Sequence, residues 1–337
     1  MSTETLAQLS DNRVYGAMAA LAVAMVALAA EAASRRVPAT AAPDAEPALV
    51  AATGAVAGAP PSAGETARPP VRPAATAGPG PGPDGQPGRA DRYGRVGTSV
   101  LVLATVLLAL GVLTRGLAAG RAPWSNMYGF AISGTLVAAV AYLVVARRQP
   151  DVRALGVWVV ATLLLTLGLA VTVLYVPVGP LVPALQSYWL VIHVAAATIA
   201  AAVFTLAMVA SALQIVAERA ERLGRRRGYV AALPPAGRLD ALAYRVTAFG
   251  FPLWTFAIVA GAIWAEASWG RYWGWDPKEV WSLVTWLVYA AYLHARTTAG
   301  WKGRRASVVS LVAYATLIFN FFGVNILFEG LHSYGGL

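Results

Sequence analysis

The sequence contains no cysteine. The chain therefore has no disulfide, no thiolate nucleophile and no cysteine-ligated metal, and it cannot itself accept a thioether bond. Histidine is also scarce, with three residues in 337: His193, His294 and His332. Because imidazole is a common metal ligand, each of the three is a candidate ligand.

Charged residues are few as well. They make up 12% of the chain, whereas hydrophobic residues make up 58%. A soluble domain carries about 25% charged residues. This composition predicts an all-α polytopic membrane protein rather than a soluble globule. The net charge of +10 would suggest nucleic acid in a soluble chain. In a membrane protein, basic residues gather in the loops on one side, and this explains the positive net charge. We therefore expect no nucleic-acid partner.

Eight apolar segments are predicted to span the membrane. Most are near the ~20 residues that the hydrocarbon core requires. They are Val14–Ala30, Thr98–Leu117, Met127–Ala146, Ala154–Val176, Ser187–Ala217, Ala243–Ala265, Glu279–Arg296 and Ser307–Phe328. An even number of spans puts both termini on the same side.

The spans divide the chain into three parts. Residues 1–33 hold the first span, and residues 97–337 hold the other seven. Between them, residues 34–96 are rich in Ala, Pro and Gly and have no amphipathic period, which predicts a disordered linker. The first span ends in ALAAEAAS, which resembles a signal-peptide cleavage site.

The basic residues orient the spans. Of the 26 Lys and Arg residues, 21 lie in the linker and in the loops around residues 147–153, 218–245 and 295–305, which share one face. Basic residues favour the cytoplasmic side, so this face is expected to be cytoplasmic. Both termini and the Trp-rich loop of residues 264–279 are then outside. Cleavage after the first span would leave the linker and this basic face outside, so we predict that the span is retained.

Tryptophan is concentrated in one stretch, Trp264–His294, which holds six of the eleven Trp residues. Within it, Asp276-Pro277-Lys278-Glu279 predicts a helix start, with Asp as the N-cap, Pro at the first position and Glu closing a capping box. That reading does not explain Trp269, Trp273 and Trp275, which are separated by glycines. They suit either an aromatic belt at the membrane interface or a surface that holds a flat ligand.

Two histidines are expected at the level of this loop. His193 lies about 9 Å from the outer end of its span at ~1.5 Å per residue, and His332 follows the last span. Two imidazoles on opposite sides of a macrocycle are what six-coordinate haem iron requires. The alternative is a hydrogen-bonded His inside the bundle and an unrelated His in the tail.

His294 lies much deeper. It is fifteen residues after Glu279, about 22 Å further along the same helix. An ionisable residue at membrane depth suggests function. No second His of this chain lies at that depth, so a two-histidine site there would need an imidazole from a partner. The alternative is an interfacial His bonded to a backbone carbonyl.

Four segments resemble one family. WGRYWGWDPKE, residues 269–279, resembles the WWD motif of the haem-handling proteins of cytochrome c biogenesis. LVPALQSYWLVIHV (181–194), GVNILFEGLHSYG (323–335) and GRAPWSNMYGF (120–130) resemble segments of the CcsA/ResC type of the System II pathway, which is named CcsB in some bacteria. The resemblance covers residues 98–337 and leaves out the linker.

The resemblance implies a multi-pass protein of the bacterial plasma membrane. With a ResB-type membrane partner it would carry haem b to the outer face and attach it to the Cys-x-x-Cys-His motif of apocytochrome c. The chain would be a subunit of a holocytochrome c synthase, with thiol-reducing proteins as further partners. Whether the chain alone is a ligating enzyme stays open.

The resemblance also assigns residues. His193 and His332 correspond to the external axial ligands, and His294 corresponds to a ligand of a second, intramembrane haem. Trp269, Trp273 and Trp275, with Asp276 and Arg271, correspond to the haem surface. Topology makes Arg271, Lys278, Arg121 and Arg115 candidates for binding the propionates.

Three other functions fit the residues less fully. A permease or channel would use the Trp residues as a belt and would bind no cofactor. A CcmC-like protein would deliver haem without making the thioether bond. An assembly scaffold for the partner would tolerate replacement of both outer histidines.

Overall fold

The computed structural model describes residues 1–35, 88–180 and 185–332. This part of the chain is helical, with no strand among the described residues. Seven of its helices are long and apolar enough to cross a membrane. The prediction of an all-α polytopic membrane protein is therefore confirmed. Most of the predicted linker, residues 36–87, lies outside the described residues.

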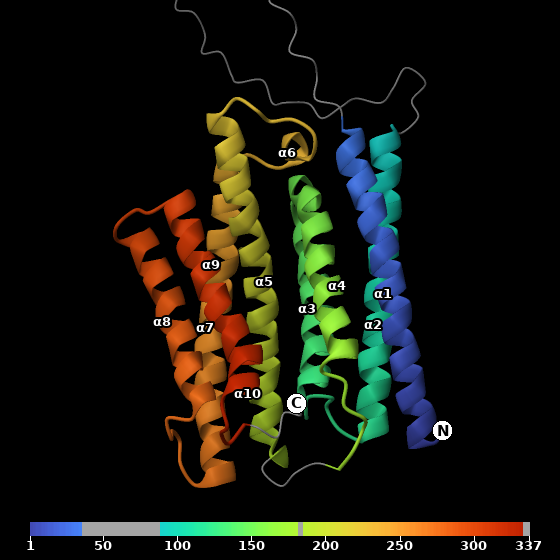
Figure 1. The fold of residues 1–337 in the computed structure, drawn as a ribbon, viewed down its shortest axis with the longest axis vertical. Coiled ribbons are helices and arrows are strands. Elements are labelled where there is room, and N and C mark those ends of the chain that lie inside the picture. The colour runs from blue at the N-terminus through green and yellow to red at the C-terminus, as the bar shows by residue number, and fades with distance from the viewer. Residues whose placement is uncertain (36–87, 181–184, 333–337) are drawn as a thin grey trace, which may run out of the picture. The chain divides into compact units, whose positions relative to one another are not determined.

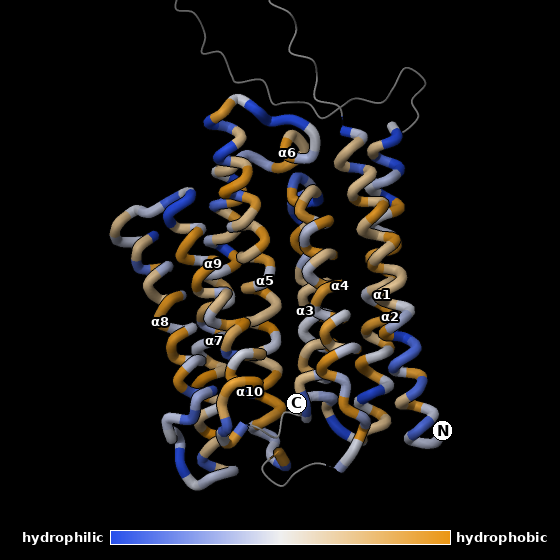
Figure 2. The backbone as a smooth tube through the Cα atoms, viewed as in Figure 1, coloured by the Kyte–Doolittle hydropathy of each residue, from blue (hydrophilic) through white to orange (hydrophobic). Residues whose placement is uncertain are grey.

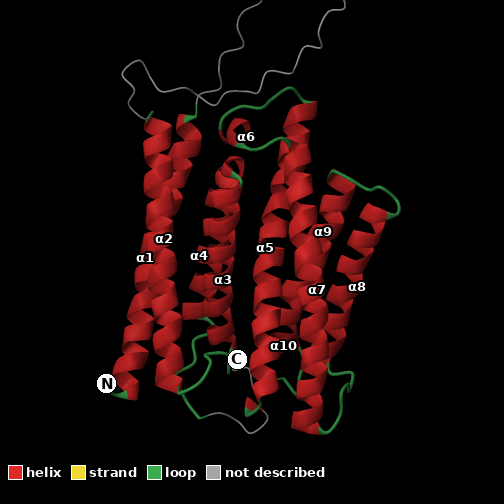
Figure 3. Cartoon of the chain, turned by 180° about the vertical axis from the view of Figure 1, so that it is seen from behind, coloured by secondary structure: helices red, strands yellow, loops and turns green. Residues whose placement is uncertain are grey.

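The first four long helices pack together (Figures 1 and 3). They are α1 (Thr3–Ser34), α2 (Arg89–Ala119), α3 (Met127–Arg148) and α4 (Gly156–Thr172), the last preceded by the 3₁₀ turn η1 (Pro150–Leu155). Glycines of α2 allow α1 to approach closely. A Cβ on Gly97 would lie 2.9 Å from the Leu28 side chain, and one on Gly94 would lie 2.5 Å from Glu31. Small residues at such contacts are typical of membrane helix pairs.

The remaining helices contain most of the candidate site residues. They are α5 (Tyr188–Arg222), the short α6 (Tyr229–Ala232), α7 (Ala236–Trp269), α8 (Pro277–Thr297) and α9 (Arg304–Ile318). A π-helical turn, η3 (Phe319–Gly323), continues α9 into α10 (Val324–Leu327). Figure 1 shows α8 beside α9 and α7 beside α5.

Several observed helices extend beyond the predicted spans, and two of them show the reason. Helix α2 begins at Arg89, within the predicted linker of residues 34–96, and α7 begins at Ala236 rather than Ala243. In both cases the helix continues through polar residues. Apolar composition marks only the part of a helix that can lie in hydrocarbon, whereas backbone hydrogen bonding continues beyond it.

Helix α8 is not among the seven apolar helices, although it is 21 residues long. Several of its interior positions are Trp or Tyr, whose N–H and O–H groups lower its mean hydropathy. It runs alongside α9 in the bundle. The predicted count of eight spans therefore stays a prediction.

The two ends of the bundle differ in charge. The ends of α1 and α2 that border the linker, and the loops that join α3 to α4, α5 to α7 and α8 to α9, lie at one end (Figure 1). Figure 2 shows hydrophilic segments gathered there. The N-terminus, the loop of residues 270–276 and the segment after α10 lie at the opposite end. The face predicted from the basic residues is thus one end of the bundle, and the Trp-rich loop is at the other.

Candidate functional site

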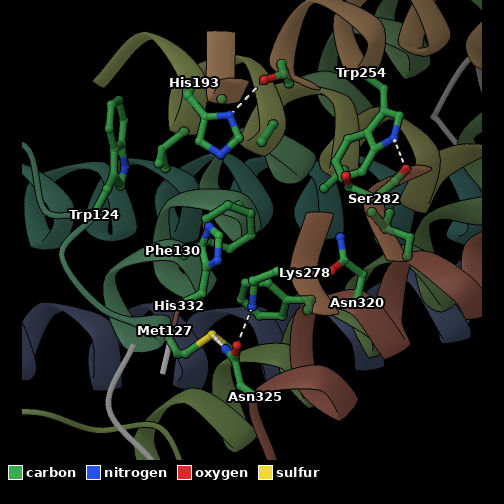
Figure 4. Close-up of a pocket in the computed structure, with 18 of the residues that line it drawn as sticks. Trp124, Met127, Phe130, His193, Trp254, Lys278, Ser282, Asn320, Asn325 and His332 are labelled. Atoms are coloured by element: carbon green, nitrogen blue, oxygen red, sulfur yellow. Dashed lines mark hydrogen bonds between the residues drawn. The ribbon is translucent and has the colours of Figure 1, made fainter. Parts of the chain in front are cut away.

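A cavity of about 280 Å³ has residues of the Trp-rich loop in its lining, and Figure 4 shows part of that lining. Its walls come from α3, α4, α5, α7, α8 and the α9–α10 segment, together with the loop before α3 and the tail after α10. Most of the lining is apolar, and aromatic side chains dominate the end near the loop: Trp124, Phe130, Trp254, Trp264, Trp269, Trp273 and Phe321. His193 and His332, the two histidines expected at the level of the Trp-rich loop, both line this cavity.

His193 enters the cavity from α5. Its Nδ1 lies 2.8 Å from the backbone oxygen of Ala257 in α7. A carbonyl oxygen can only accept, so Nδ1 carries the proton and Nε2 is the unprotonated nitrogen of the neutral ring. Gly261 makes this contact possible, since a Cβ there would lie 2.7 Å from Nδ1. Helix α7 therefore fixes both the tautomer and the position of the imidazole.

His332 enters from the tail after α10 and is oriented by a carboxylate. Its Nδ1 lies 2.8 Å from Oδ1 of Asp276, the N-cap of α8. The backbone N–H of Leu331 donates to Oδ2 of the same carboxylate at 2.7 Å. Asp276 is 7% exposed. Burial opposes ionisation of its carboxyl, but the hydrogen bond and charge of His332 and the backbone donors of Leu331 and Lys278 outweigh burial and lower its pKa to about 2.

The predicted capping box at the start of α8 is present. Glu279 completes it, because its Oε2 accepts from the backbone N–H of Asp276 at 3.0 Å and from that of Gly274 at 2.8 Å. The box therefore does more than begin a helix. It fixes the last residues of the Trp-rich loop and holds in place the carboxylate that orients His332.

Trp264 contacts both histidine rings. It is 2% exposed, and its ring is stacked on His193 at 5.9 Å and edge-on to His332 at 5.6 Å. The sequence reasoning did not select it. Its signal was helical spacing, because Ala257, Gly261 and Trp264 recur at intervals of four and three and so share one face of α7. Trp124, in the loop before α3, was also missed.

The three Trp residues predicted as a ligand surface are not equivalent. Trp269 and Trp273 line the cavity, and Trp269 also contacts His332 with ring centres 5.2 Å apart. Trp275 does not line it and is 71% exposed. Its backbone is left-handed, with φ 59°. Arg271 also lies off the cavity lining, folded over Gly274 so closely that a Cβ there would overlap its guanidinium.

His294 lies at the opposite end of α8 and takes no part in this cavity. Its ring is exposed on the surface of the chain, with Nδ1 3.5 Å from the Thr298 hydroxyl. Next to it, Arg296 forms a two-point ion pair with Asp240 of α7, at 2.6 and 3.0 Å. This pair anchors the basic-loop end of α8 to α7.

The known proteins similar to this chain are cytochrome c assembly and biogenesis proteins. Residues 124–332 match the family model "Cytochrome C assembly protein". "Cytochrome c biogenesis protein CcsA" of Synechococcus elongatus is 34% identical over 289 residues, which are 71% of this chain and 87% of that protein. CcsA of Guillardia theta is 35% identical, with 72% and 85% covered. CcsA of Chlamydomonas reinhardtii is 44% identical over 157 residues, but the match spans only 43% of that protein.

A likeness to a solved structure concerns the fold. The chain matches "Cytochrome c Heme Lyase CcmF" with a TM-score of 0.53 and 17% identity. The match covers 95% of this chain and 47% of that one, so the chain spans about half the length of this neighbour. At this identity the likeness concerns the arrangement of helices and not the chemistry of the site.

Proposed function

We propose that this chain, which belongs to the cytochrome c assembly protein family, binds haem b in the Trp-lined cavity and presents it to apocytochrome c for thioether attachment. A ResB-type membrane partner would complete the assembly. One observation carries the proposal: two histidines from distant segments line one aromatic cavity, and each has its Nδ1 held by an acceptor.

The residues present suit haem in three respects. In the neutral ring of each histidine, the hydrogen-bonded Nδ1 carries the proton, which leaves Nε2 as the nitrogen that can ligate iron. Each Nδ1–H donates to an oxygen, which fixes ring orientation and raises ligand basicity. The surrounding Trp and Phe side chains provide flat apolar surfaces for a macrocycle.

The two proposed ligands differ in how firmly they are held. His193 is part of the long helix α5 and is bonded to the backbone of α7. His332 lies beyond the last helix, and its hydrogen bonds reach the carboxylate of Asp276. We therefore assign His332 as the ligand that the histidine of the acceptor cytochrome displaces when the product leaves.

Thioether attachment adds each cysteine S–H of the acceptor across a vinyl group, so that sulfur bonds one carbon and hydrogen the other. This addition needs no oxidant. The contribution of this chain is positional: it would hold the vinyl edge where the thiols arrive, which lowers the entropic part of the barrier. Trp273 and Trp269, at the mouth formed by the loop, would bound that edge.

His294 is proposed to serve haem at the basic-loop side, on its way to the outer cavity. Its exposure on the surface of α8 leaves room for a partner helix to supply the opposite imidazole. This extends the proposal to a second haem position about 27 Å from Asp276 along α8, at ~1.5 Å per residue. Under the same proposal the basic-loop end faces the cytoplasm.

The central test compares histidine variants in the full chain with its partner. His193→Gly and His332→Gly should each abolish cytochrome c maturation, and added imidazole should restore part of it by filling the space left by the ring. The absorption spectrum of the purified protein should show six-coordinate haem in the wild type and a changed ligand field in each variant.

Two outcomes would contradict the proposal. Maturation that is unaffected by both replacements would remove the ligand assignment. Haem content that stays normal in His294→Ala of the co-purified complex would remove the second site while leaving the first intact.

A further inference from the structure

The cavity has one polar corner that the histidines do not explain. Lys278, Asn320 and Asn325 all line it, and they come from α8, η3 and α10. Lys278 Nζ donates to Oδ1 of Asn325. Figure 4 shows the lysine and the two asparagines along the same side of the cavity. Glu279 and Ser282 of α8 also line the cavity, but Glu279 accepts from the backbone N–H groups of Gly274 and Asp276, and Ser282 donates to the backbone oxygen of Glu279. The lysine and the two asparagines are the polar groups that this wall offers to a polar group on the ligand.

The charge of Lys278 is not matched by the residues around it. Within the described part of the chain, its ammonium forms no ion pair, and its printed acceptor is a neutral amide oxygen. Asp276 is nearby in sequence, but its two oxygens are engaged by His332, Leu331 and the backbone N–H of Lys278. A cation in an apolar wall is costly unless an anion accompanies it.

Asn320 provides a second, independent observation. It is 6% exposed, and its Oδ1 has no hydrogen-bond partner among the described residues. It lies in the π-helical turn η3, which interrupts α9 where the helix borders the cavity. Turns of this kind are frequent at functional sites. Either orientation of the amide is available, so it can present its N–H₂ to an acceptor on a ligand.

The other basic residues at this end are engaged elsewhere. Arg115 is 3% exposed, lies 4.3 Å above the Tyr128 ring and pairs with Asp11 at 3.7 Å. Arg121 donates to the backbone oxygens of Ala119 and Gly179. Arg271 is folded over Gly274. None of these three lines the cavity. Of the four cations that topology alone leaves as candidates, the structure selects Lys278.

We propose that Lys278, with the amides of Asn320 and Asn325, binds a carboxylate of the cavity's ligand. This inference rests on the proposed function, under which the carboxylate is a propionate of haem. The ammonium supplies the charge, and it would leave the Asn325 oxygen to meet the carboxylate. The Asn320 amide supplies one hydrogen-bond donor, and the Asn325 N–H₂ supplies a second once it leaves the Met127 sulfur. The corner thus fixes the rotation of the macrocycle about the axis through the two histidines. The vinyl edge would then point away from α8.

The test compares haem with its dimethyl ester, which has the same ring and no carboxylate. Both are titrated into the full-length chain, stripped of haem in detergent, and binding is followed by the Soret band. The wild type should bind the free acid about tenfold more tightly than the ester, equivalent to roughly 1.4 kcal/mol, as for a hydrogen bond to a charged group. Lys278→Gln should abolish this preference and Lys278→Arg should retain it. Ligand-field bands should stay unchanged in both variants.

Arg271→Gln is the matched control, because it removes an outer cation that is off the cavity, and it should keep the preference. Equal binding of acid and ester by the wild type would overturn the inference while leaving haem binding intact. Loss of the preference in Arg271→Gln to the same degree as in Lys278→Gln would also overturn it. If the wild type binds neither porphyrin, the proposed function itself is wrong. The wild-type comparison decides the matter even if a Lys278 variant does not fold.

Discussion

His332 Nδ1 lies 2.8 Å from Oδ1 of Asp276, so one carboxylate both caps α8 and orients a candidate ligand. The two roles separate in Asp276→Asn. Asn is as good an N-cap as Asp, so α8 should keep its stability. The neutral amide is a weaker partner for the imidazole, and loss of such an outer partner typically lowers metal affinity 10- to 100-fold. We expect haem affinity to fall within that range, while the melting temperature falls only by the contribution of the carboxylate charge. Haem affinity that stays at the wild-type value would show that Asp276 acts only as a cap.

The same carboxylate predicts a pH dependence of stability. The pKa of Asp276 is lowered from 3.8 to about 2 in the folded chain. A lowered pKa means that the contribution to stability is complete above the unfolded value and is lost as pH falls through the folded one. Stability should therefore fall between about pH 4 and pH 2 in the wild type more steeply than in Asp276→Asn. Thermal unfolding of the haem-free chain in detergent at pH 5, 4 and 3 measures this difference. Identical slopes would contradict it.

Gly261 is predicted to be essential for the position of His193. A Cβ at this residue would lie 2.7 Å from Nδ1, so Gly261→Ala should push the imidazole off the Ala257 carbonyl and strongly reduce the haem bound. Gly168→Ala in α4 is the control, because a Cβ there meets nothing within 4 Å. Replacing that glycine should leave haem content unchanged and raise helix stability by about 0.5–1 kcal/mol. Haem content per protein, measured as the pyridine haemochrome, distinguishes the two. Equal haem in both variants would mean that His193 tolerates displacement.

Replacing Trp264 and replacing Trp275, both in the Trp-rich loop, should change the haem content to different extents. Trp264 contacts both histidine rings, whereas Trp275 is 71% exposed and off the cavity lining. Trp264→Leu should lower haem content at least several-fold, because it removes packing from both candidate ligands at once. Trp275→Leu should leave it near the wild-type value. If Trp275→Leu loses as much haem as Trp264→Leu, the loop must rearrange around the bound ligand.

The sequence predicts the membrane class and the capping box because each depends on local or strongly periodic signals. It predicts the histidine pair because the order of the spans places both residues at the level of the Trp-rich loop. Apolar runs identify the spans, and the Asp-Pro-x-Glu pattern identifies the start of α8. The resemblance to CcsA proteins is confirmed by the relatives and rests on the motifs around His193, the Trp-rich loop and His332. The side of the membrane on which the termini lie stays a prediction. The haem-binding roles of the individual residues also stay predictions.

Other features depend on contacts between distant segments. The positions of Trp264 and Trp275 in the Trp-rich loop do not show which ring faces the cavity. The direction of each ring depends on the orientation of α7 for Trp264 and on the left-handed backbone of residue 275 for Trp275. Likewise, four outer cations are equivalent by topology. Lys278 is set apart only by the packing of Arg115 against Tyr128 and of Arg271 over Gly274, and by the hydrogen bonds of Arg121 to backbone oxygens. The π-helical turn that positions Asn320 has no marker in the apolar pattern of the last span.

The ion pair between Asp240 and Arg296 predicts where stability at the basic-loop end resides. Both side chains are about nine-tenths buried, and Asp240 also accepts from the backbone N–H of Gly303, so the pair joins α7, α8 and the start of α9. Removing one partner leaves an uncompensated buried charge, which costs about 3–5 kcal/mol. Arg296→Met should therefore lower the melting temperature clearly. Arg238→Gln breaks the exposed pair with Asp151 and should change stability by less than about 1 kcal/mol. Differential scanning of the two variants in the same detergent makes the comparison. Comparable losses would show that the buried pair is no stronger than a surface one, and that other contacts hold α8 against α7 beside His294.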